Sequence, residues 1–222
     1  MQARAVAHPN LALVKYWGKS DLQSNVPAVG SLSLTLRGMS TVTDVRFDPA
    51  LSGDEVHVGG RSDVETQTRV TRCLDVLRAQ AGVDLYAHVD STNDFPTSAG
   101  LASSASGFAA LVTAAARALD MDLSPSDLED VARLGSGSAP RSLWDGICQL
   151  SLTGDADAPT RCQSISSPER WPLDVIVAIV EPGPKKVSSR DAMASLMTIS
   201  ARLPRPRIIG SISWSYSEIK PL

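Results

Sequence analysis

The feature that most constrains this chain is a run of small residues from Pro96 to Leu119, in which a glycine- and serine-rich loop leads into an alanine-rich helix-forming segment. A helix of small residues lets neighbouring backbones approach closely, so we expect it to be buried against a sheet. The loop PTSAGLASSASG brings backbone N–H groups to a helix N-terminus, where the helix dipole favours an anion. It lacks the lysine of the GxxxxGK[ST] loop. The run therefore predicts either a phosphate site or only a tightly packed helix.

Hydrophobic periodicity in the rest of the chain predicts an α+β protein. Polar and apolar residues alternate over 31–36, and β-branched and aromatic residues recur from 42 to 47, so we expect these segments to form a strand pair. An i, i+3, i+4, i+7 apolar pattern predicts a helix over 66–79, and Ser124-Pro125 predicts the start of a short helix that ends near residue 133. Further strands are expected at 85–89, 146–152 and 173–180, and a further helix from residue 189.

Charge and composition argue against several function classes. A formal net charge of -3 gives no general attraction to nucleic acid or to anionic membranes. The most apolar stretch, 173–180, is too short to span a bilayer, and the first residues do not resemble a signal peptide. Cys73, Cys148 and Cys162 are widely spaced, which indicates neither a disulfide framework nor a zinc site. We expect a cytoplasmic protein that binds neither nucleic acid nor membranes.

A second polar segment, GSGSAPRSLW at 135–144, brings two serines close to an arginine. The guanidinium of Arg141 can form a fork with a phosphate or carboxylate while the hydroxyls of Ser136 and Ser138 satisfy further oxygens. The alternative is a solvated turn with a surface arginine.

Two cationic segments complete the set. NLALVKYWGKSD, at 10–21, sets two lysines beside two aromatic residues and could form a cationic pocket wall, although strand-edge lysines and core aromatics would look the same. GPKKVSSRD, at 183–191, holds Lys185, Lys186 and Arg190 and suits a polyanionic ligand, or else a solvated loop. The three histidines are scattered and show neither metal-ligand spacing nor a nucleophilic triad.

Taken together, NLALVKYWGK, NDFPTSAGLASSASG, GSGSAPRSLW and KKVSSRDAM resemble, in order and spacing, the motif series of diphosphomevalonate decarboxylases. The resemblance extends from about residue 6 to 198. It implies the GHMP kinase fold and the ATP-dependent decarboxylation of mevalonate 5-diphosphate to isopentenyl diphosphate, with Mg²⁺ as cofactor. Because similar enzymes often form dimers, it also suggests a homodimer. In this chain Pro140 stands where the family commonly has cysteine, and Val29-Gly30 replace polar residues.

The resemblance also assigns roles to individual residues. It implies that Arg141 orients the substrate carboxylate and stabilises developing charge, and it associates Lys15 with catalysis. It implies ATP-phosphate contacts, with Ser104 also touching Mg²⁺, from Pro96, Ser98, Gly100, Leu101, Ala102, Ser103 and Ser104. It implies substrate contacts from Asn10, Tyr16, Lys19, Ser136, Ser138, Arg141 and Arg190.

The last part of the chain departs from the family pattern. We expect an ATP- and substrate-binding domain over 1–182 and the start of a second domain over 183–222, with an aberrant tail from about residue 199. No segment matches the family's DAGPN-like motif, whose aspartate acts on the 3-hydroxyl. A frameshift or premature stop would explain this, and predicts low turnover and marginal stability. A GHMP kinase that does not decarboxylate and a non-catalytic nucleotide- or diphosphate-binding fragment stay open as alternatives.

Overall fold

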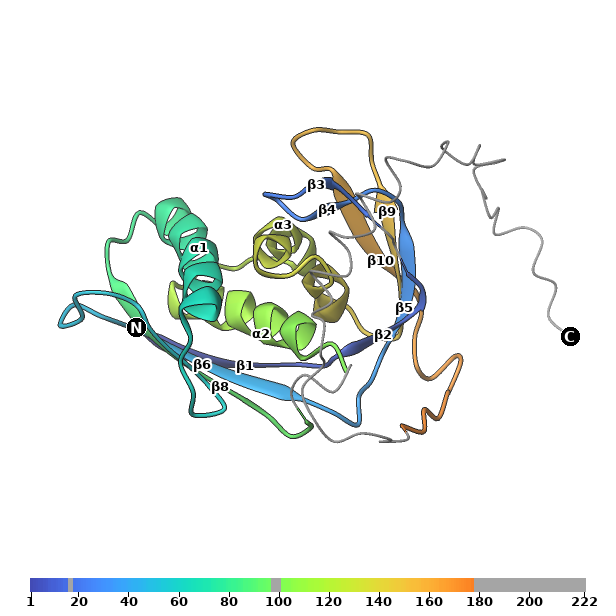
Figure 1. Cartoon of the computed structure of the whole chain (residues 1–222), viewed down its shortest axis with the longest axis horizontal. Helices are drawn as coiled ribbons and strands as arrows, with labels where there is room; N and C mark the ends of the chain where they lie inside the picture. The colour runs from blue at the N-terminus through green and yellow to red at the C-terminus, as the bar shows by residue number, and fades with distance from the viewer. Residues whose placement is uncertain (16–17, 97–100, 178–222) are drawn as a thin grey trace, which may run out of the picture.

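The structure is a computed structural model of the 222-residue chain, and it describes residues 1–15, 18–96 and 101–177 (Figure 1). In this part of the chain, two four-stranded sheets and a two-stranded ribbon surround a group of helices. The alternation of strands and helices confirms the predicted α+β class.

The first sheet has the order β1-β6-β8-β7, and only the β7–β8 pair is parallel. Its strands are β1 (Gln2–Ala7), β6 (Thr41–Asp48), β7 (Glu55–Val58) and β8 (Tyr86–Asn93). Figure 1 shows the helices lying over one face of this sheet. The residues that face them, including Val45, Phe47 and Val89, are buried in the main hydrophobic core, so this side of the molecule is held by apolar packing.

The second sheet has the order β10-β9-β5-β2 and is antiparallel throughout. Its strands are β2 (Asn10–Val14), β5 (Ser31–Thr35), β9 (Ile147–Leu152) and β10 (Thr160–Ser166). A short ribbon of β3 (Lys19–Asp21) and β4 (Val26–Pro27) lies between β2 and β5 in the chain. The sheet therefore joins segments from both ends of the described chain.

The predicted pairing of 31–36 with 42–47 is wrong, although both segments are strands. β5 pairs with β2 and β9, whereas β6 pairs with β1 and β8. The chain crosses from one sheet to the other between these strands, where the backbone N–H of Leu36 bonds to the carbonyl of Pro9. Alternation identifies a strand and its buried face, but the partner strand is chosen by packing against distant elements.

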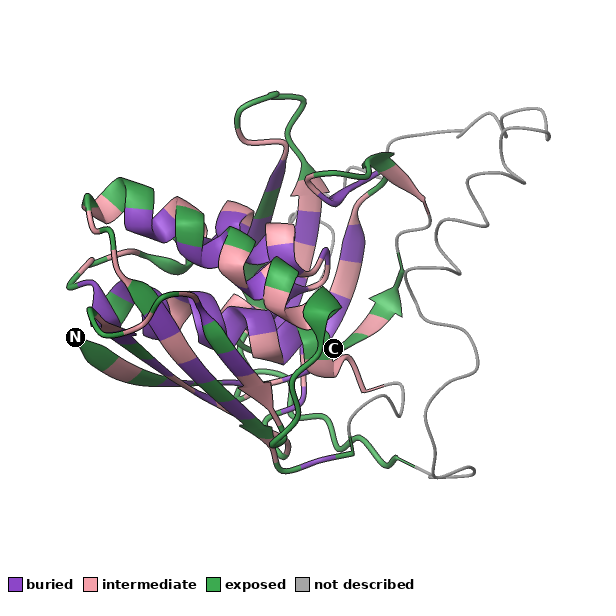
Figure 2. Cartoon of the chain, turned by 60° about the vertical axis from the view of Figure 1, so that its left-hand side comes forward, coloured by how far each residue is buried: buried purple, intermediate pink, exposed green. Residues whose placement is uncertain are grey.

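The helices follow the sequence signals closely. Helix α1 (Val64–Ala81) begins at Asp63, whose side chain accepts a hydrogen bond from Thr66 N, and ends at Gly82 with φ 66°. Helix α3 (Pro125–Gly135) begins with a capping box between Ser124 and Asp127. The small-residue helix α2 (Ser103–Ala118) packs against both β1 and β6, and its alanines are almost fully buried. Figure 2 colours buried residues purple, and they gather where the helices lie against the sheet. These helix predictions are confirmed.

Two further expectations meet the limits of the described residues. The predicted strand at 173–180 is wrong where it can be judged, because residues 173–177 form no strand, and residues 178–180 lie outside the described part. The helix expected from residue 189 and the boundary at 182 also lie outside it.

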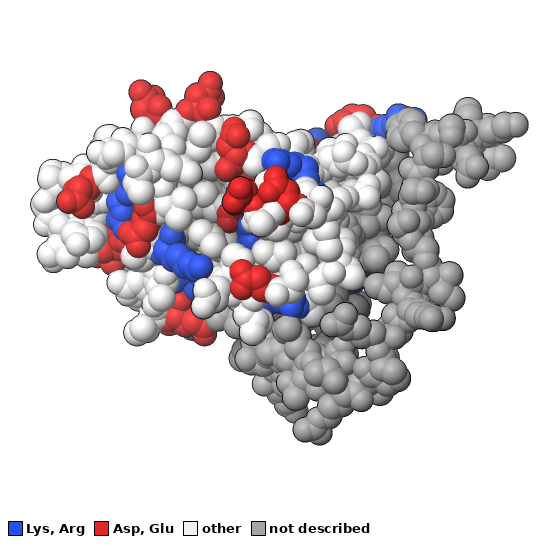
Figure 3. Space-filling model, turned by 90° about the horizontal axis from the view of Figure 1, so that it is seen from above, with Lys and Arg blue, Asp and Glu red and all other residues white. Residues whose placement is uncertain are grey.

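Among the described residues, no helix combines the length and apolar character needed to cross a membrane. On the face seen in Figure 3, acidic and basic side chains are interspersed, without a large field of one sign.

Candidate functional site: a serine cluster beside a buried arginine

The N-terminus of α2 has features that suit an anion. Ala102, the residue before the helix, has φ 52°, a left-handed conformation that is uncommon for alanine, and it offers no side-chain cap to the first N–H groups. The first turn contains no acidic residue, so no carboxylate of that turn offsets the positive end of the helix dipole. Ser103 and Ser104 add hydroxyls at the same place. An uncapped helix start of this kind suits a phosphate group.

Three serine hydroxyls from two segments of the chain meet beside this helix start. Ser104 Oγ lies 3.3 Å from Ser136 Oγ, and Ser136 Oγ lies 3.2 Å from Ser138 Oγ. Ser136 is the residue that ends α3, and Ser138 precedes the short 3-10 helix η1 (Ala139–Leu143). The structure thus brings a residue predicted to bind ATP next to two predicted to bind substrate. We call Ser104, Ser136 and Ser138 the serine cluster.

Arg141 is buried on η1 and is not the surface arginine of a solvated turn. Arg141 is only 3% exposed, and its Nη1 donates a hydrogen bond to Ser31 Oγ at 2.5 Å. Ser31 belongs to β5, so the second sheet fixes the orientation of the guanidinium. A buried arginine retains its charge, and the burial of that charge must be compensated by polar partners. The functional reading of this segment is therefore favoured over the solvated turn.

Asn10 ties the first motif to the same helix. Its Nδ2 donates to Ser142 Oγ at 2.7 Å and to the carbonyl of Ser138 at 3.2 Å, and the residue is buried. Asn10 therefore supports the backbone that carries Ser138 and Arg141.

The remaining predicted residues are placed differently. Lys19 donates from Nζ to Asn25 Oδ1 at 2.6 Å. Lys15 is exposed just beyond β2, and no hydrogen bond or ion pair with the described residues connects it to the serine cluster. Leu101 and Ala102 lead into α2, while Pro96 is exposed at the end of the preceding described segment. Outside the described residues lie Tyr16, Ser98, Gly100 and Arg190.

Arg69, Phe108 and Gly135 form a support that sequence reasoning missed. Arg69 Nε donates to the carbonyl of Gly135 at 2.8 Å, and its guanidinium carbon lies 4.6 Å from the centroid of the Phe108 ring. A Cβ on Gly135 would lie 2.0 Å from a Phe108 ring atom, so glycine is required for this close approach. The three residues join α1, α2 and α3 directly behind Ser136. Glycine at the start of GSGS was the only available signal, since Arg69 lies 66 residues away in the chain.

A buried glutamate holds the other end of η1. Glu129 of α3 accepts a hydrogen bond from Trp144 Nε1 and another from Cys162 N, both at 2.9 Å. Burial raises the pKa of this carboxyl group, and the two hydrogen bonds oppose the rise without cancelling it. Trp144 is the residue that ends η1, so Glu129 connects the arginine-bearing helix to α3 and β10.

Cys73 and Cys162 are poorly suited to act as nucleophiles. Cys73, Cys148 and Cys162 are buried and free. Burial raises the pKa of Cys73 to about 12, and contact with Cys148 together with burial raises that of Cys162. A thiol that stays protonated at neutral pH is a poor nucleophile.

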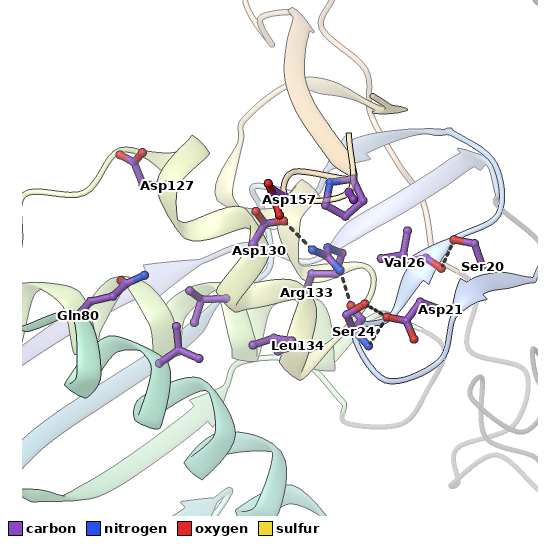
Figure 4. Close-up of a pocket in the computed structure, with 14 residues that line it drawn as sticks. Ser20, Asp21, Ser24, Val26, Gln80, Asp127, Asp130, Arg133, Leu134 and Asp157 are labelled. Carbon is purple, nitrogen blue, oxygen red and sulfur yellow. Dashed lines mark hydrogen bonds and ion pairs between the residues drawn. The ribbon is translucent and has the colours of Figure 1, made fainter. Parts of the chain in front are cut away.

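A hollow of about 500 Å³ lies between the β3–β4 ribbon, α1 and α3 (Figure 4), and its lining includes no residue of the serine cluster. Its lining includes four aspartates, at 21, 127, 130 and 157, with Arg133 paired to Asp130. Carboxylates repel phosphate, so the size of this hollow does not make it the phosphate site.

Comparison with known proteins identifies the family of this chain. Residues 7–161 match the family model of the diphosphomevalonate decarboxylase-like N-terminal domain. The chain belongs to this family. The diphosphomevalonate decarboxylase of Eremothecium gossypii is 33% identical over 233 residues, which cover 98% of this chain and 58% of the relative. The chain therefore spans little more than half the length of the curated relatives it matches.

Solved structures of decarboxylases confirm the fold. The mevalonate diphosphate decarboxylase from Enterococcus faecalis is 44% identical, with a TM-score of 0.68 over 75% of this chain and 52% of that one. A structure described as MDDEF in complex with MVAPP, AMPPCP and magnesium is 40% identical, with a TM-score of 0.72 over 87% of this chain and 59% of that one. The expected GHMP kinase fold is confirmed by these neighbours.

Proposed function

We propose that this chain forms the nucleotide- and substrate-binding part of an enzyme that decarboxylates mevalonate 5-diphosphate to isopentenyl diphosphate at the expense of ATP. The observation that carries the proposal is the meeting of the serine cluster, the uncapped start of α2 and the buried Arg141. Together they offer donors for a phosphate chain and a fixed cation for a carboxylate. Mevalonate 5-diphosphate contains both groups.

The start of α2 fits the phosphates of ATP. Backbone N–H groups of the first turn and the hydroxyls of Ser103 and Ser104 can donate to phosphate oxygens. ATP supplies the phosphoryl group that turns the tertiary hydroxyl of the substrate into a leaving group. The neighbour crystallised with AMPPCP supports this assignment for the family.

The residues present also fit Mg²⁺ bound mainly through phosphates. The described residues contain no cluster of three or more histidine, cysteine, aspartate or glutamate side chains that would hold a metal on its own. Magnesium in phosphoryl-transfer sites typically keeps waters and uses substrate phosphates beside only one or two protein ligands. The Ser104 hydroxyl is the protein ligand we propose.

Arg141 would act by position and charge. Its bond to Ser31 fixes a planar fork of donors, which matches the two oxygens of a carboxylate. A 3-hydroxy acid has no carbonyl in the β position to accept electrons, so positive character develops at C3 as the leaving group departs. A carboxylate held in a fixed orientation can then be lost as carbon dioxide. A cytoplasmic location and a homodimer stay predictions.

Titration calorimetry with mevalonate 5-diphosphate, in the presence of AMPPCP and magnesium, tests the binding part of the proposal. Arg141→Gln should weaken binding about 100-fold, because a charge-assisted fork to a carboxylate is lost. Arg4→Gln is the matched control, since this exposed arginine of β1 pairs only with Asp44 in the described part of the chain. Equal affinities for Arg141→Gln and the unaltered chain would overturn the assignment of Arg141.

A turnover assay tests the chemistry separately. Carbon dioxide and ADP are measured in one reaction with ATP and mevalonate 5-diphosphate. Release of both in equal amounts supports decarboxylation, whereas ADP without carbon dioxide would contradict it and indicate a kinase.

A further inference from the structure

Asn25 sits between the proposed substrate cation Lys19 and the end of helix α3. It lies immediately before β4, and only 9% of the residue is exposed. Its Oδ1 accepts a hydrogen bond from Lys19 Nζ at 2.6 Å, and its Nδ2 donates to the carbonyls of Arg133 and Leu134, both at 3.0 Å. The amide orientation is determined by these partners, because an ammonium only donates and a carbonyl only accepts.

The backbone around Asn25 is also specific. Asn25 has φ 57°, in the left-handed region that asparagine tolerates better than most residues. The preceding turn is closed by Asp21, which accepts hydrogen bonds from the backbone N–H groups of Gln23 and Ser24. Arg133 Nη1 in turn donates to the carbonyl of Ser24 at 2.5 Å. Hydrogen bonds at Ser24 and Asn25 therefore connect the short β3–β4 ribbon to α3.

These hydrogen bonds help to set the position of the Lys19 ammonium. A free lysine side chain has four rotatable bonds and occupies many rotamers, so a fixed ammonium needs an anchor. Asn25 can serve as this anchor because its own side chain is bonded to the carbonyls of Arg133 and Leu134. These two residues precede Ser136 by three and two positions. The last carbonyls of a helix also carry partial negative charge, which favours a cation nearby.

We propose that Asn25 is a positioning residue that holds the Lys19 ammonium at a fixed place relative to the serine cluster, so that one diphosphate group can be bound by the ammonium and the hydroxyls together. The inference rests on the proposed function, because it takes the diphosphate of mevalonate 5-diphosphate as the ligand. Asn25 acts through Lys19 and need not touch the ligand.

Calorimetry on Asn25→Gly, Lys19→Ala and the double variant tests this role. Glycine removes the amide but accepts a positive φ without strain, so the backbone turn is preserved. Asn25→Gly should weaken mevalonate 5-diphosphate binding about five- to twentyfold, because the Lys19 ammonium loses the Asn25 oxygen that helps to fix its position. In the Lys19→Ala background the same change should have no further effect, whereas a merely structural role would weaken binding in both backgrounds.

Two controls separate the possible outcomes. Asp120 has the same φ of 57° as Asn25 but is exposed and far from the ribbon in the chain, so Asp120→Gly should leave binding unchanged. AMPPCP binding should be unchanged in Asn25→Gly. If the unaltered chain binds mevalonate 5-diphosphate but the effects of the two substitutions simply add, the positioning role is wrong and the proposed function stands. If the unaltered chain does not bind it, the proposed function fails and this inference fails with it.

Discussion

The two four-stranded sheets of this protein treat buried polar groups in different ways. In the β1-β6-β8-β7 sheet, buried hydroxyls are paired with one another, as in the 2.9 Å contact between Thr43 and Ser91, and the neighbouring residues are aliphatic or aromatic. In the β10-β9-β5-β2 sheet, Ser31 bonds to Arg141, while Ser33 Oγ and Thr160 Oγ1 have no hydrogen-bond partner among the described residues. The buried hydroxyls of the first sheet are therefore satisfied within its own packing, whereas the second sheet contributes a hydrogen-bond partner to Arg141 and also buries two hydroxyls without partners among the described residues.

The largest expected effect tests the stabilising role of the first sheet. Phe47→Ala should lower the free energy of unfolding by about 3–5 kcal/mol, because Phe47 is among the largest fully buried side chains and its removal leaves a cavity. Urea denaturation measures the change. Val6→Ala on β1, where the valine is 55% exposed, is the control and should cost under about 0.5 kcal/mol. Similar losses in the two variants would show that the packing of this sheet is not the main support.

The next effect concerns the junction between the helices and the serine cluster. Gly135→Ala should cost about 1–3 kcal/mol, since the added methyl would overlap the Phe108 ring and force it to move. Adding Phe108→Leu should recover part of the loss if the clash is its cause. Thermal and urea unfolding of the single and double variants provide the comparison. Strictly additive losses would mean that another contact makes glycine necessary.

A matched pair of serine substitutions compares the two sheets directly. Ser91→Ala should cost about 1–2 kcal/mol, because it leaves the buried Thr43 hydroxyl without its partner. Ser33→Ala should be neutral to within about 0.5 kcal/mol, or stabilising, because it removes a fully buried hydroxyl that forms no hydrogen bond with the described residues. Urea denaturation midpoints rank the two variants. Equal costs at the two positions would erase the distinction between the sheets.

The smallest expected effect is a change in pH dependence. Because burial raises the pKa of Glu129 above its ordinary value of 4.5, the folded protein binds a proton more readily there than the unfolded chain. This group therefore contributes most stability at low pH, and the contribution is lost as pH rises from about 4.5 through the raised pKa. In Glu129→Gln this component should vanish, so its melting temperature should fall less than that of the unaltered chain over the same range. If the melting temperatures of the two proteins changed with pH in parallel, the assignment of this pH-dependent component to Glu129 would be wrong.

The accuracy of the sequence predictions depends on how local the determining contacts are. The capping box at Ser124 and Asp127 and the left-handed Gly82 depend on groups a few residues apart, so those helix ends were predictable. The pairing of 31–36 was not, because its partner β9 begins more than a hundred residues later. Arg141 was predicted as a site residue, but its partner Ser31 is 110 positions away and was not singled out.

By itself, the sequence determined the family, the α+β class, the boundaries of the described helices and the residue types of the proposed phosphate and carboxylate site, since motifs and caps are encoded within short segments. Only the tertiary structure decided that Ser104, Ser136 and Ser138 meet, that Arg141 is buried against β5, and that Asn25 links Lys19 to α3. These arrangements arise because burial of apolar faces brings distant segments together, and hydrogen bonds between those segments form only after that packing is in place.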